Sequence, residues 1–267
     1  MDIKAIFDRP ESEKPLDKIV DDGGFTSLFR KIAIVGDSLA SGELESMDFG
    51  SPRDYHDYFD ISWGQYLARM AGTTVYNFTR GGMSAKEFCD GFAHVNGYWS
   101  PDKAAQAYIC ALGCNDLDNM GMDPGSIEDV AEDWHYNKPT YAGYFARIIQ
   151  HYKQIQPDAY FFLLTHPREP EEIIGTVAYN NHIRQREIMY SFAEKFTNTY
   201  VIDLMEYGPD YDAEFRKLFF TGGHLNSAGY YLTAKMVGSY IDYIVRHDME
   251  KFNQCGFIGT GFKYVAQ

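Results

Sequence analysis

Four short polar segments of the chain contain the residue types that acyl transfer requires. A serine hydroxyl becomes a nucleophile when a neighbouring base removes its proton, and histidine suits that task because its ordinary pKa lies near neutrality. The tetrahedral intermediate carries an oxyanion, which backbone N–H groups and an asparagine amide can stabilise. The four segments are Gly36-Asp37-Ser38-Leu39, Arg80-Gly81-Gly82-Met83-Ser84, Gly113-Cys114-Asn115-Asp116 and Thr221-Gly222-Gly223-His224.

Four residues in these segments are candidates for catalysis. Ser38 would be the nucleophile and His224 the base, while the Ser38 N–H, the Gly82 N–H and the Asn115 side chain would hold the oxyanion. A glycine at 82 lets its N–H approach a substrate without a side chain in the way. Each residue also has a plainer interpretation, since serine, glycine and asparagine are common in turns and histidine can cap a helix. We interpret Asp37 as a structural residue.

The elements around these segments predict a sheet that would bring them together. Apolar runs alternate with amphipathic helices, and the runs are continuous, as in a parallel sheet covered on both faces. Polar segments follow the strands, and ligands of such sheets bind outside the carboxyl ends of the strands. The predicted strands are 31–36, 73–78, 107–112, 159–164 and 199–202, and the main predicted helices are 62–72, 140–155, 175–196 and 226–246.

The spacing of the elements favours one three-layer α/β domain over two domains. We expect an N-terminal arm at 1–30, the domain at 31–250 and a C-terminal tail at 251–267. An aromatic and acidic insertion, Asp54–Asp60, lies between Ser38 and the first long helix. It either shapes a cleft or forms a solvated loop.

The four segments resemble the sequence blocks of the GDSL-type, or SGNH, hydrolase superfamily, over about residues 31–246. Each block alone is weak, but four blocks in order, each at a strand end, are specific together. The resemblance implies a flavodoxin-like fold with a five-stranded parallel sheet, no cofactor, and hydrolysis of esters or thioesters. It also implies the roles given above to Ser38, Gly82, Asn115 and His224. The G-x-S-x-G motif of the α/β-hydrolases is absent, because Ala40 occupies its second glycine position.

One position departs from the family pattern. The family usually has an aspartate three residues before the histidine, whereas this chain has Thr221, which brings no charge to stabilise an imidazolium. Loss of that carboxylate in a serine protease lowers the rate by about 10⁴. A backbone carbonyl could hold His224, or the site could be slow or inactive. A carboxylate from elsewhere could also replace the aspartate, and the candidates considered are Asp203, Asp210, Asp212 and Glu214.

Two functional hypotheses follow. The first is a serine ester hydrolase that cleaves small acyl esters, with O-acetyl groups on carbohydrate as the leading substrate class. The second, motivated by Thr221, is a non-catalytic ligand- or carbohydrate-binding protein on a degenerate scaffold.

Composition excludes several other functions. The net charge of −14 argues against nucleic acid and against an anionic membrane surface as partners. The four cysteines are scattered and no Cys-His group has zinc spacing, so we expect no metal. No signal peptide and no stretch of about 18 apolar residues is visible, which favours the cytoplasm. The expected partner is a small-molecule ester, and the oligomeric state stays open.

Overall fold

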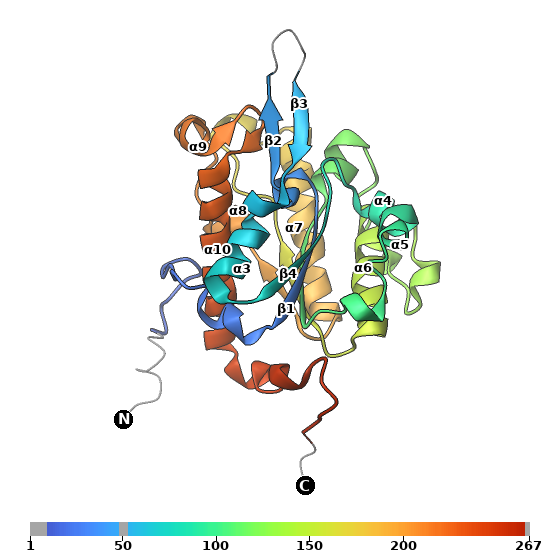
Figure 1. Cartoon of the computed structure of the whole chain (residues 1–267). Coiled ribbons are helices and arrows are strands. Elements are labelled where there is room, and N and C mark those ends of the chain that lie inside the picture. The colour runs from blue at the N-terminus through green and yellow to red at the C-terminus, as the bar shows by residue number, and fades with distance from the viewer. Residues whose placement is uncertain (1–9, 48–52, 265–267) are drawn as a thin grey trace.

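A five-stranded parallel sheet forms the centre of the molecule in the computed structural model, which describes residues 10–47 and 53–264. Its strand order is β4-β1-β5-β6-β7 (Figure 1), which is the flavodoxin-like order that the sequence predicted. The strands are β1 (Lys31–Gly36), β4 (Thr74–Thr79), β5 (Ala107–Ala111), β6 (Tyr160–Leu164) and β7 (Thr199–Ile202).

Helices cover both faces of this sheet, so the predicted three layers are confirmed. Ile32 and Ile34 of β1 pack toward α3 and α10, whereas Ala33 and Val35 pack toward α6 and α7. This alternation explains why the strand is apolar throughout. The long helices are α3 (Trp63–Ala71), α6 (Tyr141–Ile155), α7 (Val177–Lys195) and α10 (Ser227–His247).

Side-chain caps begin all four long helices close to where the sequence predicted. Ser62 caps α3, Thr140 caps α6, Thr176 caps α7 and Asn226 caps α10, and each side chain accepts a hydrogen bond from a backbone N–H in the first turn. Such a cap contributes about 1 kcal/mol. The caps therefore fix the lengths of the loops that lead from the strand ends into the helices.

Described parts of the predicted arm and of the predicted tail pack on the domain. In the predicted arm, the Glu13 carboxylate accepts two hydrogen bonds of 2.7 Å from Arg246 on α10. In the predicted tail, Phe252, Cys255 and Ile258 are buried in the same core cluster as α10. None of the helices in the described ranges is long and apolar enough to cross a membrane.

A β-hairpin stands above the carboxyl ends of the sheet strands (Figure 1). It consists of β2 (Glu43–Ser46) and β3 (Asp54–Asp57), which pair antiparallel, and part of the predicted insertion Asp54–Asp60 forms its second strand. Apart from single 3₁₀- and π-helical turns, the remaining short helices and strands are α2 (Ser38–Ser41), α4 (Ala85–Glu87), α5 (Ala93–Val95), α8 (Leu204–Tyr207), α9 (Ala213–Phe219), β8 (Phe220–Thr221) and β9 (His224–Leu225).

Candidate active site

Ser38 lies where the chain turns from β1 into the short helix α2. The Asp37 carboxylate caps this helix by accepting a 3.1 Å hydrogen bond from the Leu39 N–H. The Ser38 carbonyl accepts hydrogen bonds from the Ser41 and Tyr230 hydroxyls. Main-chain contacts thus fix the position of Ser38, and its side chain is left partly exposed at the edge of the sheet.

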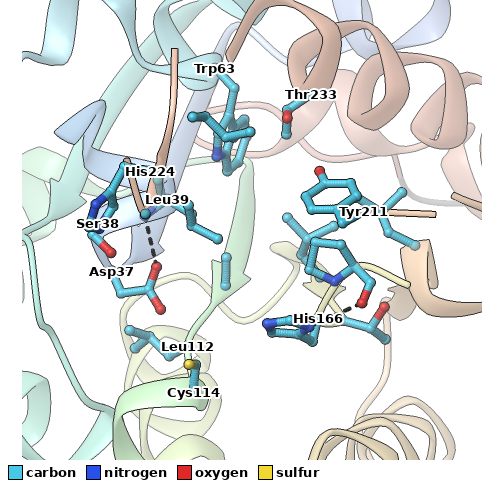
Figure 2. A pocket seen from close by; sticks show the side chains of 18 of the residues that line it. Asp37, Ser38, Leu39, Trp63, Leu112, Cys114, His166, Tyr211, His224 and Thr233 are labelled. Carbon is cyan, nitrogen blue, oxygen red and sulfur yellow. Dashed lines mark hydrogen bonds between the residues drawn. The ribbon is translucent and has the colours of Figure 1, made fainter. Parts of the chain in front are cut away.

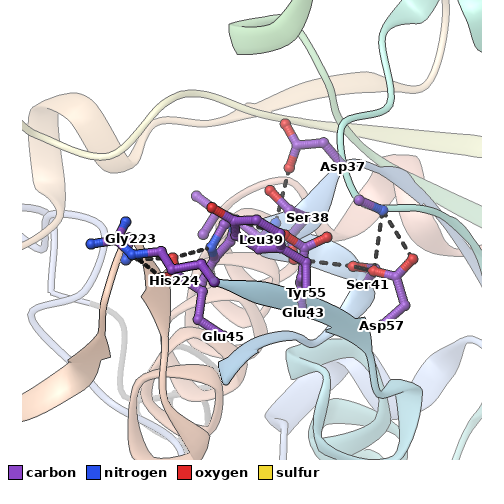
Figure 3. A network of polar contacts seen from close by, with 12 residues as sticks. Asp37, Ser38, Leu39, Ser41, Glu43, Glu45, Tyr55, Asp57, Gly223 and His224 are labelled. Atoms are coloured by element: carbon purple, nitrogen blue, oxygen red, sulfur yellow. Dashed lines mark hydrogen bonds and ion pairs between the residues drawn. The ribbon is translucent and has the colours of Figure 1, made fainter. Parts of the chain in front are cut away.

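A carboxylate from the hairpin holds His224. Oε1 of Glu45 lies 2.8 Å from His224 Nδ1 and accepts a second hydrogen bond, of 2.5 Å, from the Gly223 N–H (Figure 3). Gly222, at φ +70°, adopts a left-handed conformation, and a Cβ there would overlap the Glu45 carboxylate. Glu45 therefore stands where the imidazole needs an acceptor for its Nδ1–H.

The surroundings of Glu45 favour its ionised form. Burial would raise the pKa of this carboxyl, since only 5% of the side chain is exposed. The hydrogen bonds from His224 and Gly223 and the charges of His224 and Arg53 outweigh burial, so the pKa of Glu45 lies below its ordinary value. An ionised carboxylate can both orient an imidazole and stabilise an imidazolium.

The carboxylates proposed from the sequence do not take this place. Asp203 is buried and accepts hydrogen bonds from Arg186 and Tyr190. Asp210 pairs with Arg168, Asp212 caps α9, and Glu214 is exposed on α9. These four candidates were wrong, because all lie near β7 and α9 rather than on the hairpin. Thr221 is exposed and pairs directly with His224 across the two-residue strands β8 and β9.

A second glutamate contacts the other nitrogen of His224. Oε1 of Glu43 lies 3.0 Å from Nε2, and burial raises the pKa of Glu43 above its ordinary value. Within the described residues, no hydrogen bond joins the Ser38 hydroxyl to His224. For His224 to act as the predicted base of Ser38, Nε2 would have to exchange Glu43 for the Ser38 hydroxyl.

The three groups predicted to hold an oxyanion differ in the hydrogen bonds that they already make. Neither the Ser38 N–H nor the Gly82 N–H donates a hydrogen bond within the described part of the chain. Gly82 has φ +70°, a conformation that favours glycine. The Asn115 amide donates one hydrogen bond of 3.0 Å to the Met83 carbonyl. This bond connects the loop that follows β5 to the loop that follows β4. The amide of Asn115 has two N–H donors, so one of them is left to donate to a ligand.

Asp116 also connects the loop after β5 to the loop after β4, and it acts as a structural residue. Its carboxylate is fully buried and accepts hydrogen bonds from the Ala85 N–H at 2.8 Å and the Lys86 N–H at 3.2 Å. Burial raises its pKa to about 6. Asp116 thereby anchors the start of α4 next to the π-helical turn that begins at Asn115.

A cavity of about 280 Å³ opens beside Ser38 and His224 (Figure 2). Its lining is mostly apolar near the strand ends, and His166 and Cys114 lie on its wall. Asn115 also lines it, whereas Gly82 does not. The apolar lining side chains are Leu39, Ala40, Trp63, Ala111, Leu112, Leu164, Pro167, Leu204, Tyr211, Phe220 and Leu225.

Asp37 should make the stability of the protein depend on pH. Burial is the main reason that its pKa rises from 3.8 to about 7. Between these two values the folded protein holds a proton that the unfolded chain releases, so this group favours folding at low pH and loses that effect as pH rises from about 4 to 7. We expect the wild type to lose stability relative to Asp37→Asn over this window, as measured by urea unfolding at several pH values. A difference between the two proteins that does not change with pH would contradict this assignment.

Comparison with protein families places this chain among known sequences. The model of the GDSL-like Lipase/Acylhydrolase family matches residues 34–232, which include all four segments. No curated protein matches the chain.

Several solved structures share the fold. One is a family two carbohydrate esterase from Clostridium thermocellum in complex with cellohexaose, which is 15% identical and superposes with a TM-score of 0.58. The matched region spans 90% of this chain and 66% of the esterase chain. A family 3 carbohydrate esterase from the same organism is 16% identical and superposes with a TM-score of 0.51. Here the matched region spans 81% of this chain and 97% of the esterase chain. At these identities the likeness shows the fold alone.

Proposed function

Because the chain belongs to the GDSL-like lipase/acylhydrolase family, we propose that it is a serine ester hydrolase that cleaves small acyl esters. The observation that carries this proposal is the contact between Glu45 and His224 Nδ1 at 2.8 Å. It supplies the orienting carboxylate that Thr221 cannot supply. The alternative of a non-catalytic binding protein rested on the lack of that carboxylate. Because Glu45 contacts His224 Nδ1, this reason no longer holds.

In the proposed acylation step, the Ser38 hydroxyl oxygen bonds to the acyl carbon and its proton moves to His224 Nε2. The carbonyl oxygen becomes an oxyanion that accepts hydrogen bonds from the Ser38 N–H, the Gly82 N–H and Asn115. Collapse of the intermediate breaks the bond to the alkoxide, which takes the proton from Nε2 and leaves as the alcohol. The acyl group stays on Ser38 as an ester.

Deacylation repeats these steps with water. His224 Nε2 takes a proton from water, whose oxygen attacks the acyl carbon, and the Ser38 oxygen leaves with that proton. Glu45 stays ionised and holds Nδ1–H throughout, so that Nε2 keeps the lone pair that the base needs. In both steps Glu43 must release Nε2.

The cavity and its rim support a short acyl group on a carbohydrate. About 280 Å³ lies just below the range of about 300–1,000 Å³ that ligand pockets occupy. The Tyr55 ring lies edge-on to His224, 5.7 Å between centroids, and half of it is exposed. Tyr58 and Phe59 add exposed aromatic area next to the hairpin, and such rings suit the apolar faces of sugars. The carbohydrate esterases of the same fold are consistent with this class.

A substrate series tests this proposal. We expect hydrolysis of p-nitrophenyl acetate and butyrate, a decline in kcat/KM toward the octanoate and palmitate, and release of acetate from acetylated cellobiose. A rate that peaks at the palmitate would contradict the short acyl group. Hydrolysis of the p-nitrophenyl esters without acetate release from the sugar would contradict the carbohydrate class. No hydrolysis above the buffer rate would contradict the esterase itself.

A further inference from the structure

The wall of the cavity holds a second group of reactive side chains that the proposed ester hydrolysis does not use. Cys114 follows β5, His166 follows β6, and His182 lies on α7. One candidate ligand atom from each lies within 4.8 Å of those from the other two. We propose that Cys114, His166, His182 and Asp118 form a binding site for a divalent cation of the zinc type.

The Nδ1 atoms of the two histidines are held as in known metal sites. His166 Nδ1 lies 3.0 Å from the Pro167 carbonyl, which can only accept, so Nδ1 carries the proton and Nε2 has a lone pair. His182 Nδ1 lies 2.9 Å from Oε2 of Glu169. A carbonyl or carboxylate on the second ring nitrogen is the usual partner of a metal-binding histidine.

The rings and the remaining ligands lie close together. The two imidazoles stack with 3.7 Å between centroids and 10° between planes. Oδ2 of Asp118 lies 2.8 Å from His182 Nε2 and 3.6 Å from Cys114 Sγ. Ligand atoms of a tetrahedral zinc site, with bonds of about 2.0–2.3 Å, are separated by about 3.3–3.6 Å. The candidate atoms of Cys114, His166 and His182 lie within 4.8 Å of one another, so a separation would have to shrink by up to about 1.5 Å on binding. Because the two imidazole planes are nearly parallel, one ring would also have to rotate before both Nε2 lone pairs face one ion.

The chemistry of the donor set favours zinc over magnesium or calcium. A thiolate and two imidazoles are the ligands that zinc and its neighbours prefer, whereas hard cations take oxygen. Binding would release the thiol proton of Cys114 and the Nε2 proton of His182. The resulting two negative charges, on Cys114 and Asp118, would balance the cation. Cys114 and His166 line the cavity, so the ion would be reached from it (Figure 2).

Cobalt binding to the full-length chain, after treatment with a chelator, tests this proposal. We expect one Co²⁺ per chain, a thiolate-to-cobalt absorption band in the near ultraviolet, and displacement of Co²⁺ by Zn²⁺. Cys114→Ser should abolish that band, and both Cys114→Ser and His166→Gln should weaken Zn²⁺ binding by at least about tenfold. Zn²⁺ should also raise the Tm of the wild type but not of these variants.

Two control variants separate this site from other thiols and imidazoles. Cys255→Ser and His151→Gln change the same residue types outside the cavity, and both should bind metal as the wild type does. Glu169→Gln tests the partner of His182 and should weaken binding by about 10–100-fold. A wild type that binds no Co²⁺, or a Cys114→Ser variant that keeps the full affinity, would overturn the site. None of these readouts depends on esterase activity.

Discussion

Replacing Ser38 by alanine is expected to lower kcat/KM for p-nitrophenyl acetate by about 10⁴- to 10⁶-fold, because removal of a nucleophile of this kind costs that much in other serine hydrolases. A sulfonyl fluoride should modify the wild type once, at Ser38, and leave the variant unmodified, as measured by intact mass. The variant should fold, because the hydrogen bonds at this position use the main-chain carbonyl of Ser38. Equal rates in the two proteins would refute the assignment of the nucleophile.

Ser41→Ala is the matched control for this experiment. Ser41 lies on the same short helix, and its hydroxyl contacts the Ser38 carbonyl and Asp57. We expect it to cost less than about tenfold in kcat, since its hydroxyl is bonded to protein atoms and does not line the cavity. A loss as large as that of Ser38→Ala would mean that the alanine at 38 acts through the loop rather than through the missing nucleophile.

The second large effect is expected for Glu45→Gln, which should lower kcat by about 10³- to 10⁴-fold. In the wild type Oε1 of Glu45 meets both the Gly223 N–H and His224 Nδ1, so a glutamine oxygen can keep both contacts but carries no negative charge. The loss is expected because the neutral amide no longer stabilises the imidazolium that forms when His224 takes a proton. The rate of single-turnover acylation, followed by p-nitrophenol release, measures the loss.

Glu43→Gln is the control for that variant, because Glu43 lies on the same hairpin strand and contacts the same imidazole. Glu43 faces Nε2 rather than Nδ1, so its replacement should change kcat by less than about tenfold. If the two effects were reversed in size, Glu43 would be the orienting acid and the proposed orientation of His224 would be wrong.

A second substitution can test the same contact by restoring a carboxylate next to His224. Thr221 and His224 are cross-strand partners, whose Cβ atoms are typically about 4.5–5.5 Å apart. An aspartate at 221 is therefore near enough to replace Glu45. Glu45→Gln combined with Thr221→Asp should recover at least about tenfold in kcat over Glu45→Gln alone. Without any recovery, the loss in Glu45→Gln would reflect damage to the hairpin.

The sheet was predictable because most of its strands are continuous apolar runs, while β4 is rich in β-branched and aromatic residues. The bounds of β1 and β7 agree with the sequence, those of β5 and β6 differ by one residue at one end, and β4 is shifted by one residue at both ends. The long helices begin at polar caps that the sequence shows, such as Ser62 and Asn226. The hairpin was not predicted, because Glu43–Ser46 is too short and too polar to stand out as a strand.

The candidate site was predictable only where its residues follow strands. Ser38, Asn115 and His224 were predicted at the sheet edge, and the structure places all three around one cavity. Glu45 was missed because its position depends on how the hairpin folds back over His224. One signal was present, namely an acidic segment that begins soon after Ser38 in a chain that lacks an acid at 221.

Cys114, His166 and His182 escaped notice for a related reason. Zinc motifs are recognised by ligands that are close in sequence, whereas these three come from two strand ends and a helix. Only the parallel sheet brings them together. Long-range placement of this kind leaves no local pattern.

The position of Glu45 also bears on how related sequences are found and grouped. Glu45 stands seven residues after Ser38, so the proposed acid and nucleophile share one short segment, while the proposed base, His224, lies far along the sequence. A search pattern that demands an aspartate three residues before the histidine would discard such chains as inactive descendants. A pattern that accepts a glutamate on a hairpin after the serine would retain them.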